Sequence, residues 1–545
     1  MAQLEPVLSV SYVDQGLWTD ERVGWLLPRA AHRWPHRTAL VIEGDRLTFA
    51  ELESWADLVA TRLRAAGIEP GDVVLTQLPN SVEGIVAQLA AWRIGAVSAP
   101  VIGVFRAREL RPVVADVRPR AVVASIGEGS RRPADELDGV LAAAGLDPVL
   151  RWSVGPGSAE GWRPFPPRPG ERGTQQAVPS PASAGETCLV LFTSGTTADP
   201  KGVRHSARSL LAEAHSYRDT ARIGPADTVL APSSIAHIGG AVAATVLPSV
   251  VGCRVVAMPR WDAAAAARLC DEEEVTLGIG VPVHLVDLLE RYDGADAGRR
   301  PPERFAIGGA TVAPRVIERA EAAGICAWRA WGMTEAPTVT VAGPDDPLWR
   351  RAGFDGRVDY GAQVQAVGPD HVPVPPGTAG ELRLRSPKQM LGYTSSEATA
   401  AQVDADGWFY TGDIGMLDDD GWLTVLGRTK DIINRGGEKF PARDIEAAIL
   451  DHPAVAAAAV VGAPKPRLGE QVVAFVVLRA GASWPGDAAL VAHLNDLRLA
   501  RQKMPVAWRV LHALPATPTG KVRKNVLLER WDQTDSGVIT SAGPD

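Results

Sequence analysis

The chain has 545 residues, of which 46% are hydrophobic and 22% are charged. This length exceeds what one hydrophobic core normally supports, so at least two domains are expected. The net charge of −8 gives no sign of a nucleic-acid-binding surface. The first residues, MAQLEPVLSV, lack a secretory pattern, and no stretch approaches the roughly 18 apolar residues of a membrane span. The cysteines show no CxxC spacing, which argues against a zinc site and favours the reducing cytoplasm; they are Cys188, Cys253, Cys270 and Cys326.

Strand and helix patterns alternate from the first hundred residues. Thr48 and Glu51 have the spacing of a capping box, which predicts a helix that ends near Ala66. A buried strand is expected over 73–78, and a second helix over 81–94. Such alternation is typical of parallel sheets covered by helices.

The same alternation continues from Thr187 to about Trp331. Before it, residues 155–186 are rich in Pro, Gly, Ser and Arg, which predicts a surface loop. Within it, the apolar run 238–253 is interpreted as a buried strand, a turn and a helix. From Leu382 the pattern changes to the short strands LRLR, WFYTGD and WLTVLG, which indicate a small β-rich subdomain.

A separate unit is expected after Arg428, with a helix over 442–450 and strands over 454–461 and 471–478. The fold class is therefore α/β, or α+β overall. A large N-terminal domain of helix-covered sheets carries the β-rich subdomain, and a smaller α+β domain follows. The expected boundaries are 1–428 for the N-terminal domain, 429–532 for a mobile C-terminal domain and 533–545 for a disordered tail.

The segment TSGTTADPKGV, Thr193 to Val203, follows the apolar run CLVLF. Its glycines allow backbone N–H groups to approach phosphate oxygens, its hydroxyls add donors, and its lysine adds positive charge. It is not a Walker A loop, because no GK[ST] occurs, and no GxGxxG follows a strand. The predicted phosphate ligands are Thr193, Ser194, Gly195, Thr196, Thr197 and Lys201.

This segment resembles the signature of the adenylate-forming superfamily, which includes acyl- and aryl-CoA synthetases, adenylation domains of peptide synthetases, and luciferases. Ala198 stands where the family usually has Gly. The resemblance covers about residues 20 to 530 and is greatest to stand-alone acyl-CoA synthetases and acid–CoA ligases. The further motifs occur in the family's order: GGAT (308–311), WGMTE (331–335), YTGD (410–413), GRTKDIINRGGEKFPARDIE (427–446) and PTGKVRK (518–524).

The resemblance implies a nucleoside site. Trp331 would stack on adenine, and Gly309 and Ala310 would lie on the adenine side. Asp413 would accept hydrogen bonds from both ribose hydroxyls, which suits a carboxylate with two oxygens. Arg428 would be the second ribose contact.

The resemblance also implies the catalytic groups and the substrates ATP and CoA. Lys521 would bridge the substrate carboxylate and the α-phosphate, and Thr334 would contact the α-phosphate. Glu335 and Thr196 would hold Mg²⁺, which prefers few carboxylates together with phosphate oxygens. Because both reactants are anions, these groups would reduce repulsion in the transition state.

The thiol half-reaction is implied for the C-terminal domain. Lys430 occupies the position of the family's hinge residue. Gly436 and Gly437, with Lys439 nearby, would line the approach of the thiol to the adenylate. Rotation of the domain would withdraw Lys521 and bring the glycines forward.

The segment SSIAHIGGAV (233–242) resembles the family's acyl-pocket motif. No acidic residue is placed to hold an α-amine, and no cation is placed for a second carboxylate. A hydrophobic monocarboxylic acid of medium or larger size is therefore favoured, whether alicyclic, aromatic or fatty. The expected lining residues are His237, Ile238, Gly239, Gly240, Gly308, Gly332, Met333 and Pro337.

The expected activity is ATP-dependent formation of an acyl-AMP, with release of pyrophosphate, followed by thioester formation with CoA. Three alternatives remain: an acyl-AMP ligase that loads a carrier protein in trans, a luciferase-like oxygenase, and a degenerate nucleotide-binding protein. The expected partners are a small carboxylic acid and CoA or a carrier protein. Neither a nucleic acid nor a membrane span is expected, and a homodimer is left open.

Overall fold

The computed structural model describes residues 12–127, 129, 131–170, 182–193, 200–310, 312–435, 438–466, 468–516 and 522–532. The chain forms two compact units. Within the described residues, the first unit covers positions up to 193, 200–363 and 384–409, and the second covers positions 364–383 and 410–532. Across the described residues, no helix is both long and apolar enough to cross a membrane.

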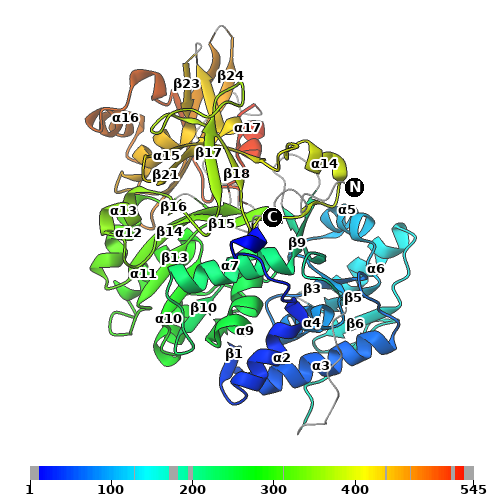
Figure 1. Ribbon diagram of the computed structural model, residues 1–545. Coiled ribbons are helices and arrows are strands. Elements are labelled where there is room, and N and C mark those ends of the chain that lie inside the picture. Colours follow the sequence, from blue (N-terminus) through cyan, green and yellow to red (C-terminus); the bar gives the residue numbers. More distant parts are fainter. Residues whose placement is uncertain are drawn as a thin grey trace. The chain divides into compact units, whose positions relative to one another are not determined.

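In the described chain, one sheet of the first unit has nine strands, in the order β16-β15-β14-β13-β12-β10-β11-β1-β2. Its central pairs are parallel, and antiparallel pairs lie at both ends. Helices α10 (Ala263–Glu272), α11 (Pro282–Tyr292) and α12 (Pro314–Ala322) share a hydrophobic core with this sheet and gather on one side of it (Figure 1). The strands are β1 (Thr38–Ile42), β2 (Asp45–Thr48), β10 (Thr228–Ala231), β11 (Arg254–Ala257), β12 (Leu277–Gly280), β13 (Arg304–Ile307), β14 (Cys326–Met333), β15 (Ala336–Val341) and β16 (Arg357–Val358).

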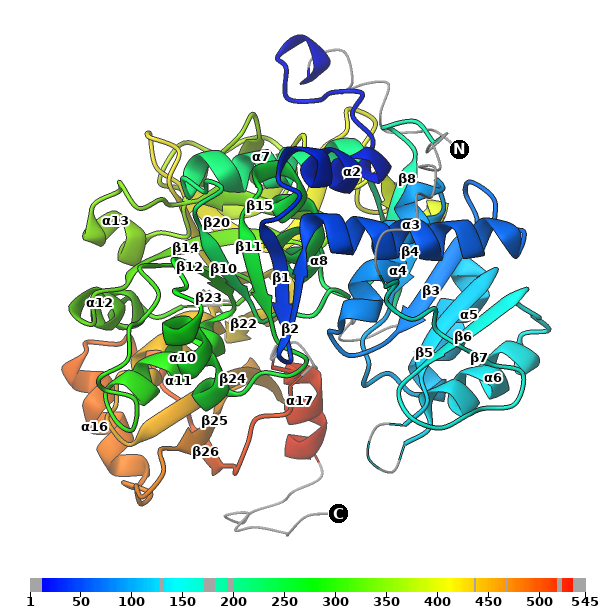
Figure 2. The ribbon, with the colours of Figure 1, turned by 90° about the horizontal axis from the view of Figure 1, so that it is seen from below.

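The second sheet of this unit has eight strands in the described residues, in the order β19-β9-β8-β4-β3-β5-β6-β7. Helices α5 (Ala107–Val117) and α6 (Pro133–Ala143) cover one face, as Figure 2 shows beside β5 to β7. The strands are β3 (Val73–Gln77), β4 (Val97–Pro100), β5 (Ala121–Ser125), β6 (Leu150–Val154), β7 (Arg163–Pro164), β8 (Thr187–Thr193), β9 (Lys201–Ser206) and β19 (Gly392–Tyr393). The remaining longer helices of the unit are α2 (Val23–Arg33), α3 (Phe49–Ala65), α4 (Val82–Arg93) and α7 (Ala207–Thr220).

The helix starts predicted near the N-terminus are confirmed. Thr48 caps α3: its Oγ1 accepts from Glu51 N at 3.2 Å, and its backbone N–H donates to Glu51 Oε2 at 2.8 Å. This bond lowers the pKa of Glu51. Ser81 caps α4 in the same way, through Gly84 N at 3.2 Å.

Two local predictions differ from the structure. The run 238–253 contains no strand: it forms α8 (Ile238–Ala241), a π-helical turn (Val242–Val246) and α9 (Leu247–Val251). A run buried on all sides has no periodicity to separate helix from strand, which explains the error. In the predicted loop 155–186, the described residues include the buried Trp162 and the buried Phe165, so part of it belongs to the core.

The second unit contains a four-stranded sheet, β17-β18-β20-β21, and a five-stranded sheet, counted over the described residues. Alternate residues of β24 and β25 face opposite sides: Val460 and Val472 pack with α15 and α16, whereas Val461 and Val473 pack with α17. The elements are β17 (Gln363–Val367), β18 (Gly380–Arg385), β20 (Phe409–Leu417), β21 (Leu423–Arg428), β22 (Ile432–Arg435), β23 (Glu438–Pro441), β24 (Val455–Lys465), β25 (Gly469–Leu478), β26 (Ala507–Val510), α15 (Ala442–Leu450), α16 (Asp487–Asp496) and α17 (Lys524–Asp532).

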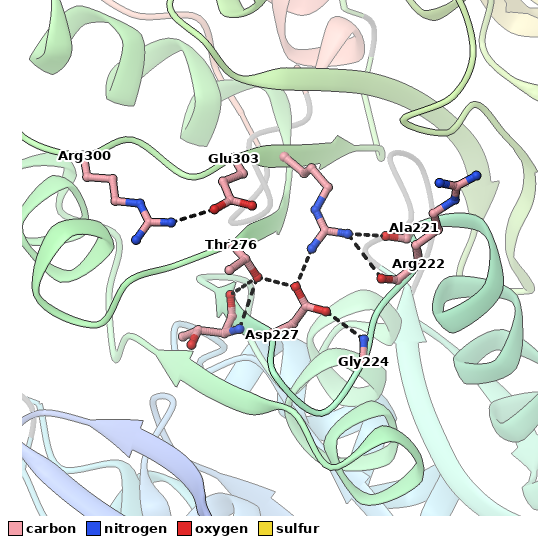
Figure 3. Close-up of polar contacts among 9 residues, drawn as sticks. Ala221, Arg222, Gly224, Asp227, Thr276, Arg300 and Glu303 are labelled. Atoms are coloured by element: carbon pink, nitrogen blue, oxygen red, sulfur yellow. Dashed lines mark hydrogen bonds and ion pairs between the residues drawn. The ribbon is translucent and has the colours of Figure 1, made fainter.

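A polar network closes the amino-terminal edge of the nine-stranded sheet (Figure 3). Asp227, which precedes β10, accepts from Thr276 Oγ1 at 2.6 Å and from Gly224 N at 2.7 Å, and it also pairs with Arg304. Arg304 donates to the carbonyl of Ala221 at 2.5 Å. The polar groups at the amino ends of β10, β12 and β13 are thus hydrogen-bonded to one another. In parallel sheets, ligands usually bind at the carboxyl ends of the strands, which lie at the opposite edge.

Candidate active site

The predicted phosphate loop joins two paired strands. Thr193 ends β8, Lys201 begins β9, and the two residues face each other in the antiparallel register. Lys201 is exposed and Thr193 is half-buried. The other predicted ligands, Ser194, Gly195, Thr196 and Thr197, lie outside the described residues.

The predicted adenine-side residues lie at the carboxyl edge of the nine-stranded sheet. β13 ends at Ile307, so Gly308, Gly309 and Ala310 follow directly, and the neighbouring strand β14 carries Trp331. Gly309 has a φ of +81°, a conformation that favours glycine. Trp331 is buried, with 8% of its surface exposed.

Thr334 and Glu335 form the turn between β14 and β15, just beyond the pair Met333–Ala336. The register shifts at this point, and a Cβ on Gly332 would lie 2.4 Å from Thr338 N. Gly332 is therefore needed for the close approach of the two strands, whatever its part in an acyl pocket.

The eight-stranded sheet holds this turn by its backbone. His205 on β9 is fully buried, and its Nε2 lies 2.7 Å from the carbonyl oxygen of Thr334. Burial lowers the pKa of His205 to about 4, so the imidazole is neutral near pH 7 and donates Nε2–H to this carbonyl. Met390 N donates to the carbonyl of Glu335 at 2.7 Å.

Tyr393 on β19 contacts the side chain of Glu335. Its hydroxyl lies 2.7 Å from Glu335 Oε1 and 2.6 Å from Gln402 Oε1. Lys201 Nζ lies 5.1 Å from the centroid of the same ring, within cation–π range. Burial and the charge of Glu335 raise the pKa of Tyr393, so the phenol keeps its proton.

A buried lysine lies behind the same turn. Lys388 is fully buried, and its Nζ donates to Ser216 Oγ and to the carbonyl of Thr338, both at 2.6 Å, and pairs with Asp359 at 3.2 Å. Glu213 lies 3.7 Å from Lys388 Nζ and accepts from Thr338 Oγ1 at 2.6 Å. Thr338 has a φ of +40°, a strained value for a β-branched residue, and this network holds it there.

The predicted ribose residues are brought together in the second unit. Asp413 on β20 faces Arg428 at the end of β21, and Arg428 Nε lies 3.1 Å from Asp413 Oδ1. Asp413 is buried, with its backbone N–H bonded to Thr411 Oγ1 at 3.0 Å. The two residues for which the family resemblance implies ribose contacts therefore form an ion pair with each other.

The predicted acyl-pocket residues occur at several chain positions. Asn80 anchors the approach to α8: it accepts from Ile235 N at 2.9 Å and donates to the carbonyl of Ser233 at 3.0 Å. His237 is the N-cap residue directly before this helix, and burial lowers its pKa to about 4. Ile238, Gly239 and Gly240 follow in α8, Gly308 follows β13, and Gly332, Met333 and Pro337 lie on β14 and β15.

The two glycines of α8 have different surroundings. A Cβ on Gly240 would lie 2.1 Å from the carbonyl oxygen of Ser234, so no side chain fits there. A Cβ on Gly239 would meet no heavy atom within 4 Å. Only Gly239 therefore has space beside it for a substrate or for a larger side chain.

Gly436 and Gly437, predicted along the approach of the thiol, and Lys521, the predicted adenylation lysine, lie outside the described residues. Lys430 lies in the short helix Thr429–Asp431 and Lys439 lies in β23, but their side chains are likewise not described. The described residues on either side of Lys521, Ala516 and Val522, form a β-bridge.

The residues present fit a magnesium ion with a nucleotide. Among the described residues, no group of three or more His, Cys, Asp or Glu side chains could enclose a metal. Glu335 is half-buried, and its Oε2 has no hydrogen-bond partner in the described part of the chain. One carboxylate suits Mg²⁺, which commonly takes one or two carboxylates together with substrate phosphates.

His205, Tyr393, Lys388 and Asn80 were not predicted from the sequence. Each acts through a partner far away in the chain: His205 and Thr334, for example, are 129 residues apart. Tyr393 lies outside every motif that the family resemblance singled out. A sequence pattern could therefore not identify their contacts.

Comparison with known proteins gives a consistent family. Residues 27–394 match the AMP-binding enzyme family, and residues 444–521 match the AMP-binding enzyme C-terminal domain. The chain is 31% identical to the medium-chain fatty-acid–CoA ligase of Escherichia coli over 95% of this chain and 92% of that protein. It is 35% identical to the sulfoacetate–CoA ligase of Cupriavidus necator over 92% of this chain and 96% of that protein.

A solved structure, ATP-bound MatB from Rhodopseudomonas palustris, superposes with a TM-score of 0.80 at 28% identity, covering 94% of this chain and 99% of that one. The α/β fold expected from the sequence, with a large N-terminal and a smaller C-terminal part, is thereby confirmed. The chain belongs to the AMP-binding enzyme family and is an AMP-forming acid–CoA ligase, which converts its acid and ATP to an acyl-adenylate and then forms the thioester with CoA.

Proposed function

We propose that the acid activated by this ligase is a hydrophobic monocarboxylic acid of medium or larger size. The observation that carries this proposal is the environment of α8. His237 has a pKa of about 4, so it supplies no cation near pH 7 for a second acidic group. Gly239 has open space beside it, which leaves room for an acyl chain or ring.

The names of the two relatives indicate two different kinds of acid substrate. One acts on medium-chain fatty acids, which agrees with the proposal, and another acts on sulfoacetate, a small acid with two anionic groups. A sulfonate would need a cation to balance its charge. The expected lining residues include no lysine or arginine, so we favour the hydrophobic acid and use sulfoacetate as the challenging competitor.

The roles of the nucleotide-binding residues are part of the proposal. Lys201 and the hydroxyls from Thr193 to Thr197 would bind phosphate oxygens, and Trp331 would stack on adenine. Asp413 and Arg428 would hold the ribose; their ion pair supports this role, because it fixes the orientation of the carboxylate.

The reacting groups are assigned in the same way. Lys521 would bring the carboxylate and the α-phosphate together, and Thr334 would donate to the α-phosphate. Glu335, with Thr196, would hold Mg²⁺, which neutralises phosphate charge when it is bound. The turn that carries Thr334 and Glu335 is bonded at both carbonyls, and such preorganised groups lower the barrier without rearrangement during the reaction.

The proposal also includes the functional division at 428/429, with Lys430 as hinge and Gly436, Gly437 and Lys439 along the path of the thiol. CoA is the acceptor, and transfer to a carrier protein in trans is the alternative. We place the enzyme in the cytoplasm, since none of its cysteines is in a disulfide in the described structure.

A pyrophosphate-release screen tests the acid. Purified protein with ATP and Mg²⁺ is offered fatty, alicyclic, aromatic and amino acids and sulfoacetate, with and without CoA, and products are identified by mass spectrometry. Acyl-CoA formation from one hydrophobic class, with no turnover of sulfoacetate, is expected. Preferential turnover of sulfoacetate would reject the hydrophobic pocket, and release of pyrophosphate without an acyl-CoA product would favour a carrier protein.

A further inference from the structure

The side chain of Glu335 is contacted by Tyr393, which lies 58 residues later in the chain. Tyr393 lies on β19, which pairs with β9 through Tyr393–Val203 and Gly392–Arg204. Tyr393 is 2% exposed, and its hydroxyl lies 2.7 Å from Glu335 Oε1. A buried tyrosine that touches a half-buried carboxylate has few other orientations, because its ring is enclosed by the core.

We propose that Tyr393 is the positioning residue of the Glu335 carboxylate: its hydroxyl donates to Oε1 and thereby directs Oε2 toward the metal–nucleotide complex. This inference rests on the proposed role of Glu335 as the magnesium ligand. Tyr393 itself touches neither the metal nor the reacting atoms.

The second contact of the hydroxyl explains how its hydrogen is directed. A phenol has one hydrogen, so it donates to only one of its two neighbours, Glu335 and Gln402. A carboxylate accepts only, whereas the amide of Gln402 offers N–H donors once its oxygen and nitrogen are exchanged. The satisfied arrangement is Gln402 donating to Tyr393 and Tyr393 donating to Glu335.

The same ring also faces the phosphate loop. Lys201 Nζ lies 5.1 Å from the ring centroid of Tyr393, and Lys201 begins the strand that pairs with β19. One aromatic side chain thus contacts both the proposed phosphate lysine and the proposed metal carboxylate. A displacement of Tyr393 would therefore change the positions of Lys201 and Glu335 together. A tyrosine that served only to pack the core would not need to contact both residues.

Three variants test the inference. Tyr393→Phe removes the hydroxyl and keeps the ring, Glu335→Gln removes the metal carboxylate, and Tyr292→Phe is a matched control on α11. Binding of a non-hydrolysable ATP analogue is measured by calorimetry over a range of Mg²⁺ concentrations, with thermal melting to confirm folding. Partners behind metal ligands typically change metal affinity by about 10–100-fold when they are removed.

For Tyr393→Phe we expect the Mg²⁺ concentration for half-maximal analogue binding to rise about tenfold. Binding in the absence of Mg²⁺ and thioester formation from pre-made acyl-adenylate should remain as in the wild type. Tyr292→Phe should match the wild type in every measurement. If the Mg²⁺ dependence is unchanged in Tyr393→Phe but shifted in Glu335→Gln, the inference about Tyr393 is overturned, while the proposed role of Glu335 is retained. An unchanged Mg²⁺ dependence in Glu335→Gln would instead reject the proposed role of Glu335.

Should Tyr393→Phe fail to fold because the Gln402 amide loses its partner, the double variant Tyr393→Phe/Gln402→Leu replaces both polar groups by apolar ones. Such paired replacement avoids the penalty of an unsatisfied buried group. The double variant is expected to show the same tenfold rise, and a wild-type Mg²⁺ dependence in it would overturn the inference.

Discussion

The imidazole Nε2 of His205 lies 2.7 Å from the carbonyl oxygen of Thr334, so a strand of the eight-stranded sheet is bonded directly to the turn that carries Glu335. Because this histidine is fully buried and neutral, the bond joins the two sheets of the first unit without burying a charge. The turn is therefore supported by residues distant from it in the chain.

Stability should fall in acid partly because of His205. Burial lowers its pKa from 6.5 to about 4. Between these pH values the histidine is protonated in the unfolded chain and neutral in the folded chain. This contribution to stability is complete above pH 6.5 and is lost as the pH falls toward 4, by up to about 3 kcal/mol. Urea unfolding of wild type and His205→Gln at several pH values measures it.

His205→Gln should depend less steeply on pH over this window than the wild type. The control is His32→Gln, which changes an exposed histidine on α2 and should keep the wild-type slope. Equal slopes in His205→Gln and the wild type would show that His205 does not contribute.

Replacing Lys388 by Met should destabilise the protein by about 3–5 kcal/mol, because Glu213 and Asp359 would lose their buried cation. The matched control is Lys503→Met, whose lysine is partly exposed and pairs with Asp444 at 2.6 Å; a loss of at most about 1 kcal/mol is expected there. Denaturant midpoints compare the two. Similar small losses in both would mean that the Lys388 network is not stabilising the strained Thr338.

Gly239→Val should shift acid preference toward smaller acids. The new side chain enters open space, so folding should be retained while bulkier acids lose about tenfold or more in kcat/KM. Steady-state kinetics over a series of chain lengths provides the measurement. Gly240→Ala, one residue along, should instead lower the melting temperature, because its Cβ would meet the Ser234 carbonyl at 2.1 Å. An unchanged length preference in Gly239→Val would place the acyl group elsewhere.

Lys521→Ala should lower the rate of adenylation by about 10²–10³-fold and spare thioester formation from pre-made acyl-adenylate. Pyrophosphate exchange and single-turnover thioester formation measure the two steps separately. Lys524→Ala is the matched control: that lysine pairs with Glu446 at 2.8 Å, so its loss should affect stability and not one step selectively. Equal loss of both half-reactions in Lys521→Ala would contradict the assignment.

Local signals predicted local structure well. The Thr48–Glu51 spacing predicted the start of α3, and the helix expected over 442–450 is α15. The family resemblance also directed attention to Asp413 and Arg428, which form an ion pair in the structure; their role at the ribose stays a prediction. By contrast, the run 238–253 carries no periodic signal, and its helices are imposed by surrounding layers.

The contacts of His205, Tyr393 and Lys388 could not be predicted for a different reason. Each side chain is ordinary in its own segment, and its importance arises only when distant strands come together. Tyr393 and Glu335 are 58 residues apart, and Lys388 and Ser216 are 172 apart. Such pairings depend on tertiary structure that a single sequence does not display.

The pairing of β19 with β9 has a consequence for biosynthesis. A ribosome that adds about 5–20 residues per second completes Tyr393 roughly 10–40 s after Val203, its partner across the two strands. During this interval the nascent chain presents β9 as an unpaired strand edge, which is a site for aggregation or for chaperone binding. Slow translation between these positions would prolong that exposure, and the carboxylate of Glu335 acquires its partner only when β19 has emerged.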